Sequence, residues 1–385
     1  MSAGNGPAGD RRRFLVVGAG LAGASAAWHL ARRGHAVTVV ERDVPASAAG
    51  SSHGSARILR FAYPDLDYVQ WVQEATAGWR ELAEVSGTQV LTPTVALDYG
   101  VTRNPAALAA VLARAGVAHE LLTPDQARGR WAGLRPDTDV LAHPGWVIDA
   151  ESTVHAMLGQ AQSHGAHVES GFSVAGLTRT PTGLSARAAD GRTVDADHVV
   201  IAAGGWLPDL LDGLDLPAGF RAAIPGFTVR EENAFHFPYR DQGAARWPTL
   251  IHKRPEMAVY SLPGDRDAGF RGQKVAEYEG GSVIGSATHG SGTVDQANRA
   301  RVVEYVREFL PGLDPEPYAE TTCLFTTTPS EDFVIDTAND VTVLSACSGH
   351  GAKFAPLLGR WAADTALAGT AVVPRFGVQR ETAGV

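Results

Sequence analysis

Three glycines near the start of the chain have the spacing of a dinucleotide-binding turn. Gly18, Gly20 and Gly23 form the pattern GxGxxG between an apolar strand and an alanine-rich helix, and residues 36–40 form a second apolar strand. The first glycine allows a tight turn, the second lets the backbone approach a pyrophosphate, and the third lets the helix pack close to the strand. The amides at the start of the helix then face the phosphates. This unit predicts NAD or FAD binding; the simpler alternative is a glycine-rich turn without a ligand.

An acidic residue stands where the second strand ends. Glu41 is in a position to accept hydrogen bonds from both ribose hydroxyls of a bound dinucleotide. Its negative charge would repel the 2′-phosphate of NADP, so that cofactor is disfavoured.

A run of short strands in the middle of the chain favours FAD over NAD. An apolar strand, HVVIAAGGW, ends in Gly204 and Gly205 and is preceded by three short strands with an Asp190-Gly191 hairpin turn, at residues 167–173, 184–188 and 192–194. A meander that returns to a buried strand is similar to the FAD domain of glutathione-reductase-type flavoproteins. The alternative is an ordinary parallel strand followed by a turn.

Composition excludes several classes of protein. The chain has 385 residues, 44% of them hydrophobic, and its net charge of −9 is spread along the sequence, which argues against nucleic-acid binding. No apolar run reaches the ~18 residues that span a bilayer. The two cysteines are too few for a cysteine-based metal site, so we expect no metal, and they are typical of a reducing compartment. We therefore expect a cytoplasmic protein, although Arg11 to Arg13 faintly resemble a twin-arginine export signal.

The last part of the chain again places a glycine-rich turn before a helix. The segments FVID and VTVLSAC read as strands joined by an Asn339-Asp340 turn. The turn at residues 348–351 leads into a helix over residues 352–367, in which Pro356 is tolerable only in the first turn. The start of this helix could stabilise negative charge on a reduced flavin ring.

Four blocks give the chain a resemblance to a known family. They are VVGAGLAG, GSSHGSARILR, CLFTTTPSEDFVID and SGHGAKF, in the family's order along nearly the whole length. With these blocks the sequence resembles the monomeric sarcosine oxidase and N-methyltryptophan oxidase family of FAD-dependent amine oxidases. The resemblance implies that the sulfur of Cys323 is joined to the 8α-methyl of the flavin, and it leaves Cys347, on an apolar strand, as the structural cysteine.

The resemblance also assigns charged residues to the substrate and to the flavin. Arg60 and Lys353 sit where the family clamps the substrate carboxylate, Arg57 where an arginine lies over one flavin face, and His53 near the ring. Without the blocks, a surface ion pair, a solvated helix end and a loop histidine would be the better readings of Arg60, Lys353 and His53.

Lys274 aligns with the lysine that the family holds over the other flavin face, where a cation stabilises superoxide; alone it would read as a solvated strand residue. Tyr260 corresponds to a pocket tyrosine. Further cofactor contacts are predicted at Arg42, Ser51, Ser52, Val174, Gly204, Trp206, Gly349 and Gly351.

Three positions depart from the family pattern and concern the substrate. Tyr278 replaces a histidine, Phe325 a tyrosine, and Ala352 an aromatic residue. The pocket should therefore be larger and less polar, which favours a cyclic imino acid or an N-alkyl or aromatic amino acid over sarcosine. Tyr278 and His53 are the titratable candidates for a base. Candidates for apolar walls are Phe227, Phe235, Phe237, Tyr239 and Trp247, although aromatic residues at this density more often belong to the core.

We thus predict an α/β fold in which a glutathione-reductase-type FAD-binding (Rossmann-like) domain is interleaved with an antiparallel-sheet substrate domain. The first comprises residues 1–94, 150–224 and 328–385, and the second residues 95–149 and 225–327, including strands at LDYG, GWVID and FTVREENAFHF and a helix over residues 301–312.

The expected activity is oxidation of a small carboxylate-bearing amine or imino acid to an imine, with O2 reduced to H2O2, by a monomeric FAD enzyme. Alternatives are an FAD dehydrogenase that uses another electron acceptor, an NAD-dependent enzyme, and a flavoprotein whose cofactor is structural or a redox sensor.

Overall fold

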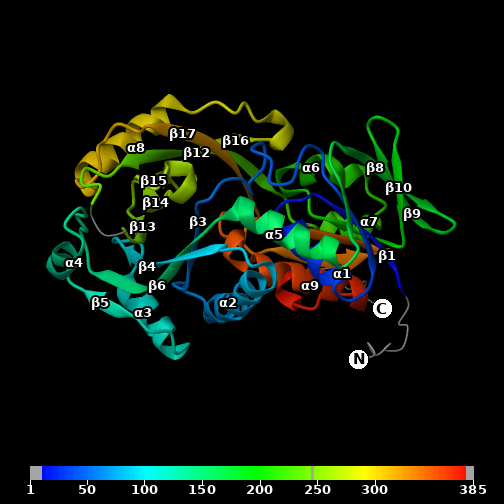
Figure 1. Ribbon diagram of the computed structural model, residues 1–385, viewed down its shortest axis with the longest axis horizontal. Coiled ribbons are helices and arrows are strands. Elements are labelled where there is room, and N and C mark those ends of the chain that lie inside the picture. The colour runs from blue at the N-terminus through cyan, green and yellow to red at the C-terminus, as the bar shows by residue number, and fades with distance from the viewer. Residues whose placement is uncertain (1–10, 244–246, 379–385) are drawn as a thin grey trace.

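The computed structural model describes residues 11–243 and 247–378; the ends of the predicted domain ranges, residues 1–10 and 379–385, and residues 244–246 lie outside this part. Two large sheets dominate it, one in each half of the molecule, and both described chain ends lie in the half that contains α1 and α9 (Figure 1). No helix of the described residues is long and apolar enough to cross a membrane.

The first sheet has six strands and is parallel except for one edge. Its order is β18 (Val334–Ala338), β19 (Val341–Ser345), β11 (His198–Ile201), β1 (Arg13–Val17), β2 (Ala36–Val40) and β7 (His167–Glu169), with β18 antiparallel to β19. Strand β7 is shorter than predicted because the chain turns at Gly171, which has φ of +67°. The predicted Asn339-Asp340 turn is present, and both residues have positive φ.

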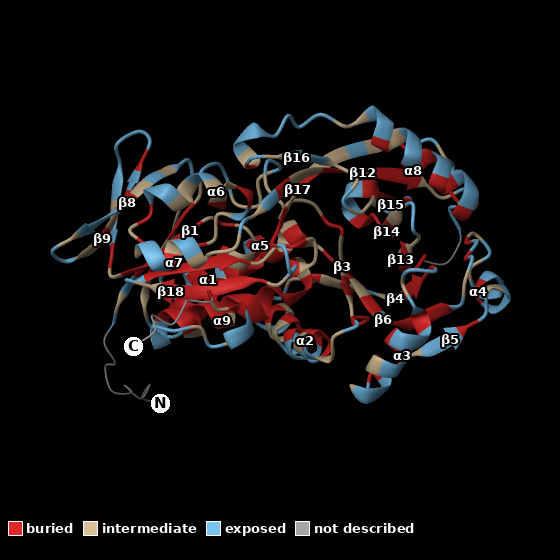
Figure 2. Ribbon diagram, turned by 180° about the vertical axis from the view of Figure 1, so that it is seen from behind, coloured by how far each residue is buried: buried red, intermediate tan, exposed pale blue. Residues whose placement is uncertain are grey.

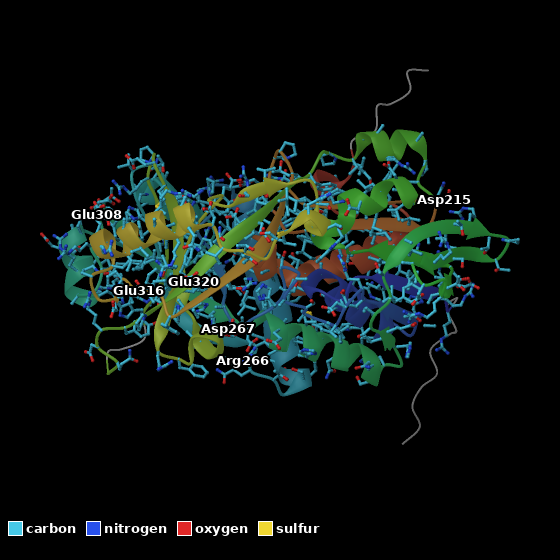
Figure 3. All side chains as sticks on the ribbon, turned by 90° about the horizontal axis from the view of Figure 1, so that it is seen from above. Asp215, Arg266, Asp267, Glu308, Glu316 and Glu320 are labelled. Atoms are coloured by element: carbon cyan, nitrogen blue, oxygen red, sulfur yellow. The ribbon has the colours of Figure 1, made fainter. Side chains whose placement is uncertain are left out.

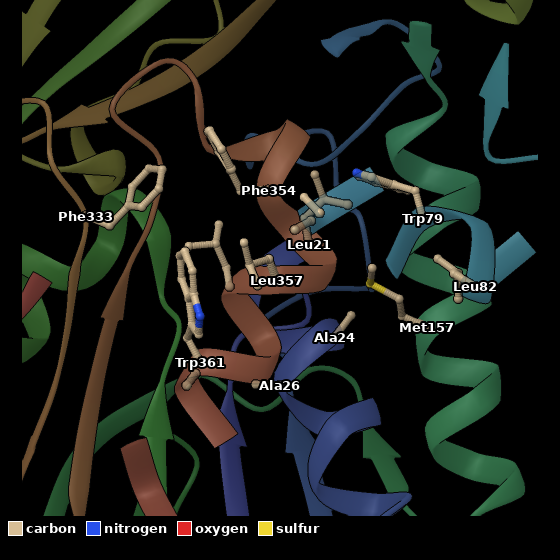
Figure 4. Packing of buried hydrophobic residues seen from close by; sticks show 14 of the residues in the cluster. Leu21, Ala24, Ala26, Trp79, Leu82, Met157, Phe333, Phe354, Leu357 and Trp361 are labelled. Carbon is tan, nitrogen blue, oxygen red and sulfur yellow. The ribbon is translucent and has the colours of Figure 1, made fainter. Parts of the chain in front are cut away.

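Both faces of this sheet are covered, as expected for parallel strands. Phe14 and Val16 of β1 face the helices, which are α1 (Leu21–Ala31), α2 (Leu66–Ser86), α5 (Ala150–Ser163) and α9 (Ala355–Ala368). Leu15 and Val17 face the other way, toward the short helices α6 (Leu207–Leu210) and α7 (Ala218–Ala223) and the antiparallel meander of β8 (Val174–Thr180), β9 (Gly183–Ala188) and β10 (Thr193–Ala196). Figure 4 shows side chains of α1, α2, α5 and α9 meeting in the helical layer.

The second sheet is mixed and has ten strands. The main path runs β16 (Ser282–Ile284), β12 (Thr228–Pro238), β15 (Gly272–Glu277), β14 (Ala258–Pro263), β13 (Thr249–Lys253), β4 (Leu91–Tyr99), β6 (Val140–Ile148) and β3 (Arg57–Arg60). In addition, β17 (Ala319–Thr327) pairs with β12, and β5 (Glu120–Leu122) pairs with β6. Strand β3 belongs to this sheet although its residues fall in the range predicted for the FAD-binding domain.

The helices of the second half are α3 (Pro105–Arg114), α4 (Pro124–Arg130) and α8 (Gln296–Phe309). Helix α8 begins earlier than the predicted residue 301 because Asp295 accepts hydrogen bonds from two backbone amides of the first turn. The predicted C-terminal helix is divided into a 3-10 turn, Gly351–Phe354, and α9, with Pro356 in the first turn of α9. In both halves the residues coloured as buried are concentrated where helices and sheet face each other (Figure 2).

Candidate active site

A cavity of about 440 Å³ lies where β1 and β2 end and α1 begins. Open α/β sheets bind ligands at this edge. The cavity wall includes the predicted cofactor contacts Gly18, Gly20, Glu41, Arg42, Ser51, Ser52, Val174, Gly204, Trp206, Gly349 and Gly351. The structure therefore brings these sequence-predicted residues together around one space.

The third glycine of the GxGxxG pattern is required by close packing. A Cβ atom at Gly23 would overlap the carbonyl oxygen of Gly18, so only glycine lets α1 approach the turn this closely. At the start of α1 the amide of Leu21 donates to Ser52 Oγ at 3.0 Å, and the N-cap residue, Gly20, has no side chain that could cap the helix. Gly20 and Leu21 line the cavity, so the start of α1 faces it and can bind phosphate there.

The acid predicted for the ribose lies at the same end of the cavity. Glu41 accepts hydrogen bonds from the amides of Ala19, at 2.8 Å, and Asp43, at 3.2 Å, which hold its carboxylate in the cavity wall. The guanidinium of Arg42 lies 4.6 Å from the centroid of the Trp206 ring. The indole Nε1 of Trp206 is buried and has no hydrogen-bond partner among the described residues.

Both cysteines line the far end of the cavity. Cys323 is on β17 and buried. Cys347 is half-buried and lies just beyond β19; its Sγ accepts from the amide of Thr326 at 3.5 Å. Placing Cys347 on an apolar strand was therefore wrong, because the strand ends at Ser345 and the chain turns into the cavity wall.

Two cations lie close to Cys323. Burial raises the pKa of the Cys323 thiol, and the charges of Lys274 and Arg57 oppose that rise. Opposite Cys323 on the neighbouring strand is Glu232, which is 1% exposed and was not predicted. Its Oε2 accepts from the amide of Gly281 at 3.0 Å, whereas its Oε1 has no partner in the described part of the chain. Burial raises the pKa of Glu232 to about 7.

A second cavity of about 570 Å³ adjoins the first, and Ala46, Ser47 and Arg57 line both. Lys274 and His53 lie in its wall. Lys274 is buried on β15, and no hydrogen bond or ion pair of its ammonium is found within the described residues.

The groups of this cavity influence one another's protonation. Burial, with a contribution from Arg57, lowers the pKa of Lys274 to about 8. Burial and the charges of Arg57 and Lys274 lower the pKa of His53 to about 4, so the imidazole is neutral at pH 7. Neutral His53 therefore shares the cavity wall with Lys274.

The loop that carries His53 is fixed to the turn between β14 and β15. Asp267, labelled beside Arg266 in Figure 3, accepts from the amide of Ser55 at 2.6 Å, and its own amide donates to Ser55 Oγ at 2.9 Å. This reciprocal pair positions the loop in front of β3.

The predicted carboxylate-binding residues, Arg60 and Lys353, line neither cavity; Lys353 directly follows Gly351 and Ala352, which line the first one. The Arg60 guanidinium and the Lys353 ammonium are 5.0 and 5.5 Å from the centroid of the Tyr63 ring. Lys353 donates to the carbonyl oxygen of His350 at 2.7 Å, and Arg60 donates to that of Ala62. Burial, then Arg60, lowers the pKa of Lys353 well below its usual value. A bound anion would relieve this unfavourable burial of charge.

A buried acid that was not predicted from the sequence lies close to these cations. Asp98 is fully buried, and the guanidinium of Arg103 lies 2.6 Å from its carboxylate. His143 Nε2 is 3.0 Å and Arg60 3.8 Å from the same carboxylate. Although burial opposes ionisation, Arg103 and Arg60 hold the pKa of Asp98 well below its usual value. Neither Asp98 nor Arg103 belongs to a motif that could have revealed it.

The three positions that depart from the family pattern lie in or next to the wall of the first cavity; they are Tyr278, Phe325 and Ala352. Phe325 and Ala352 line it, and the rings of Tyr278 and Phe325 are 5.8 Å apart. Gly349 has φ of +65°, and a Cβ atom there would lie 2.8 Å from the Tyr278 ring. The hydroxyl of Tyr278 donates to Glu331 at 3.1 Å. Burial and Glu331 raise the pKa of Tyr278, which leaves it protonated and unsuited to act as a base.

Tyr260 is half-buried and packs against Ala56, Val147 and Leu262. Burial, with a further contribution from Cys323, raises the pKa of Tyr260 well above its usual value, so it too keeps its proton.

The apolar walls were predicted wrongly. None of the five predicted aromatic residues lines either cavity. Phe235, Phe237 and Trp247 belong to the core of the second half, with Tyr239 packed against it, because the side of the sheet on which they lie is covered by α8. Phe227 packs against the core beneath the meander.

The sequence matches the family described as FAD dependent oxidoreductase over residues 13–365. The chain belongs to this family. The monomeric sarcosine oxidase of Bacillus sp. (strain NS-129) is 29% identical over 371 residues, which cover 92% of each chain. The N-methyl-L-tryptophan oxidase of Yersinia pestis (strain Pestoides F) is 29% identical over 363 residues, 91% of this chain and 93% of that enzyme. The predicted resemblance is thereby confirmed.

A solved structure supports the fold of this FAD-dependent oxidoreductase. The open form of NikD, an unusual amino acid oxidase essential for nikkomycin biosynthesis, aligns with a TM-score of 0.84 and 24% identity over 96% of this chain and 98% of that one. The predicted α/β fold is confirmed.

The cavity residues fit FAD. The cavity is continuous from the GxGxxG turn, where Gly23 permits the close approach, to the two cysteines and the start of α9. The unpartnered indole nitrogen of Trp206 and the start of α1 are donors for the dinucleotide. No group of three or more His, Cys, Asp or Glu side chains within the described residues could hold a metal ion.

Replacing Glu232 should change how stability depends on pH. The pKa of Glu232 is raised from 4.5 to about 7, so the wild type loses folding stability as pH rises through this range, whereas Gln at this position does not titrate. From pH 4.5 to pH 8, the free energy of unfolding of Glu232→Gln should rise by roughly 1–3 kcal/mol relative to that of the wild type. Urea unfolding at the two pH values measures this change. Glu308→Gln, at an exposed position of α8, is the control. Equal curves for E232Q and the wild type at both pH values would contradict the buried, unpaired carboxyl.

Proposed function

We propose that this protein is an oxidase of amines that carry a carboxylate. It converts the carbon–nitrogen bond to an imine, and O2 is reduced to H2O2. The observation that carries the proposal is the pair of cations on the Tyr63 ring, half-buried Arg60 and buried Lys353, next to Gly351 and Ala352 of the cavity wall. When bound, FAD supplies the acceptor for the hydride equivalent that leaves the carbon beside the nitrogen.

The carboxylate is held by Arg60 and Lys353. Arg60 presents a planar fork, and Lys353 a point charge fixed by the carbonyl of His350. Tyr63 donates to His350 Nδ1 at 3.0 Å, while His350 Nε2 donates to the carbonyl oxygen of Glu331, also at 3.0 Å. These bonds fix the neutral imidazole, whose pKa is lowered to about 3 by burial and Lys353. Lys353 is therefore held in place for an anion.

The substrate is larger than sarcosine. Sarcosine oxidases and N-methyl-L-tryptophan oxidases are among the relatives, so substrates in this group differ widely in size. Ala352 leaves space at the cavity, and Phe325 adds an apolar wall. A cyclic imino acid, or an N-alkyl or aromatic amino acid, suits these walls. The amine reacts in its neutral form, because Tyr278 holds its proton and His53 lies beside Lys274.

Lys274 acts on oxygen. Its ammonium is buried in the wall of the second cavity, so the field around it is stronger than in water. A cation held where negative charge develops on oxygen lowers the barrier to electron transfer.

We also propose that the sulfur of Cys323 is joined to the flavin; Arg57 and Lys274 support this by opposing the rise in the pKa of the thiol that burial causes. A cytoplasmic location is proposed on the paucity of cysteines and on the unpaired state of both, and a monomer on the similarity to the monomeric sarcosine oxidase.

The proposed function is tested by anaerobic mixing with a panel of N-methyl amino acids and cyclic imino acids. An accepted substrate should bleach the flavin absorbance at 450 nm in ~1:1 stoichiometry, since each amine gives up two electrons to one FAD. Air should then restore the colour with release of H2O2. Bleaching without peroxide would favour a dehydrogenase with another acceptor, and a flavin that no amine bleaches would refute the proposal.

Lys274→Met should slow the reaction with oxygen by about 10²–10³-fold, the usual effect of removing one preorganised charge or donor, while flavin reduction by substrate changes far less. Stopped-flow measurement of the two half-reactions separates these effects. In the wild type the rate constant for oxygen should fall as pH rises through about 8, the pKa of Lys274, because the cation is lost. Equal slowing of both half-reactions in K274M would exclude the assigned role.

Acid-precipitated wild-type protein should stay yellow, and Cys323→Ser should release its flavin into the supernatant. Cys347→Ser is the matched control, because Cys347 lines the same cavity. A colourless wild-type pellet would show that no covalent bond forms. Release by C347S rather than C323S would place the bond on the other cysteine.

A further inference from the structure

The substrate end of the site holds more positive charge than one carboxylate needs. Its cations are Arg60, Arg103, Lys253 and Lys353, and the buried carboxylate among them is Asp98. Arg103 neutralises Asp98 through two short contacts, at 2.6 Å from NH2 and 2.7 Å from Nε. Arg60 is more distant, at 3.8 Å.

Lys253 is the cation that the proposed function does not use. It ends β13, is half-buried, and has its ammonium 5.5 Å from the centroid of the Tyr278 ring. That ring packs against Phe325, which lines the cofactor cavity. Burial, then Arg103 and Arg60, lowers the pKa of Lys253. Within the described residues no carboxylate lies within ion-pair distance of its ammonium.

A cation–π contact followed by hydrogen bonds connects Lys253 to the carboxylate-binding lysine. Tyr278, under Lys253, donates to the side chain of Glu331 at 3.1 Å. The carbonyl oxygen of Glu331 accepts from His350, and that of His350 accepts from Lys353 at 2.7 Å. The ammonium groups of Lys253 and Lys353 therefore border one group of charges, since Arg60, Arg103 and Asp98 act on the pKa of both lysines.

Arg254, the next residue in the chain, is a cation that is paired with acids. Arg254 lies 3.7 Å from Asp137 and 3.6 Å from Glu256, so two acids balance it. Among the described residues Lys253 has no acid within ion-pair distance; the acids that act on it, Glu331 and Asp98, are more distant, although it is half-buried and close to two arginines. Partly buried cations without a counter-ion are costly, which makes Lys253 a candidate for binding an anion that the protein does not supply.

With Asp98 and Arg103 neutral as a pair, this group contains the cations Arg60, Lys253 and Lys353 and the acid Glu331, a surplus of two positive charges. The α-carboxylate of an amino acid balances one. We propose that the substrate carries a second carboxylate, which pairs with Lys253, so that the preferred class is N-alkyl dicarboxylic amino acids. This inference rests on the proposed oxidase function. A phosphate, with nearly two negative charges, would overcompensate.

The test compares isosteric substrates that differ by one charge, on the purified holoenzyme. These are N-methyl-L-glutamate against N-methyl-L-glutamine, and N-methyl-L-aspartate against N-methyl-L-asparagine. In at least one pair the wild type should prefer the acid by about tenfold or more in kcat/KM, equivalent to about 1.4 kcal/mol. Lys253→Met should bring that ratio close to one, and Lys253→Arg should retain it. Arg254→Gln is the matched control and should also retain it.

A binding measurement gives a readout that does not depend on turnover. Thiodiacetate and (methylthio)acetate differ by one carboxylate and contain no nitrogen to oxidise. Their dissociation constants, read from perturbation of the flavin spectrum, should favour thiodiacetate in the wild type and not in K253M.

The outcomes separate the two proposals. Oxidation of acid and amide at equal kcat/KM in both pairs would overturn the second carboxylate and leave the oxidase function intact. A preference that persists in K253M would overturn the role of Lys253. If no amine reduces the flavin, the oxidase function is wrong, and equal binding of thiodiacetate and (methylthio)acetate would overturn the dianion site as well.

Discussion

The antiparallel pairing of β12 with β17 is the interaction on which the candidate site depends. It joins nine residues of each strand, Thr228–His236 with Ala319–Thr327. Strand β17 carries Cys323 into the cofactor cavity and continues into the six-stranded sheet through β18, while β12 also pairs with β15, which carries Lys274. Because side chains alternate along a strand, a shift of one residue would turn Cys323 away from the cavity. The register therefore sets the distance between Lys274 and Cys323.

How much could be predicted from the sequence depended on how local the signal was. The βαβ unit from Gly18 to Glu41 was predictable because all its parts lie within one short segment, and the blocks around Cys323 and Lys353 carried enough identity to suggest a family. Asp98 and Arg103 were not predictable, since a buried ion pair has no signature until the fold brings in its partners.

The aromatic residues of β12 show a different limit. Phe235 and Phe237 alternate as a strand should, but alternation does not say which face borders a cavity and which is covered by a helix. The same ambiguity applied to Cys347, whose apolar neighbours predicted a strand that in fact ends at Ser345. Which face of a strand borders a cavity, and where the strand ends, depend on contacts between segments that are distant in the sequence. Both therefore became visible only in the folded chain.

Strand β3 begins with Arg57 and ends with Arg60, and each arginine accompanies a different buried lysine. Arg57 lies with Lys274 where the two cavities adjoin, and Arg60 lies with Lys353 on the ring of Tyr63. On the proposed roles, the amine and oxygen react at separate sites on one flavin. Substitutions in the amine site can then admit a larger substrate without changing the residues that act on oxygen. Substrate range can diversify in this way while peroxide formation stays the same.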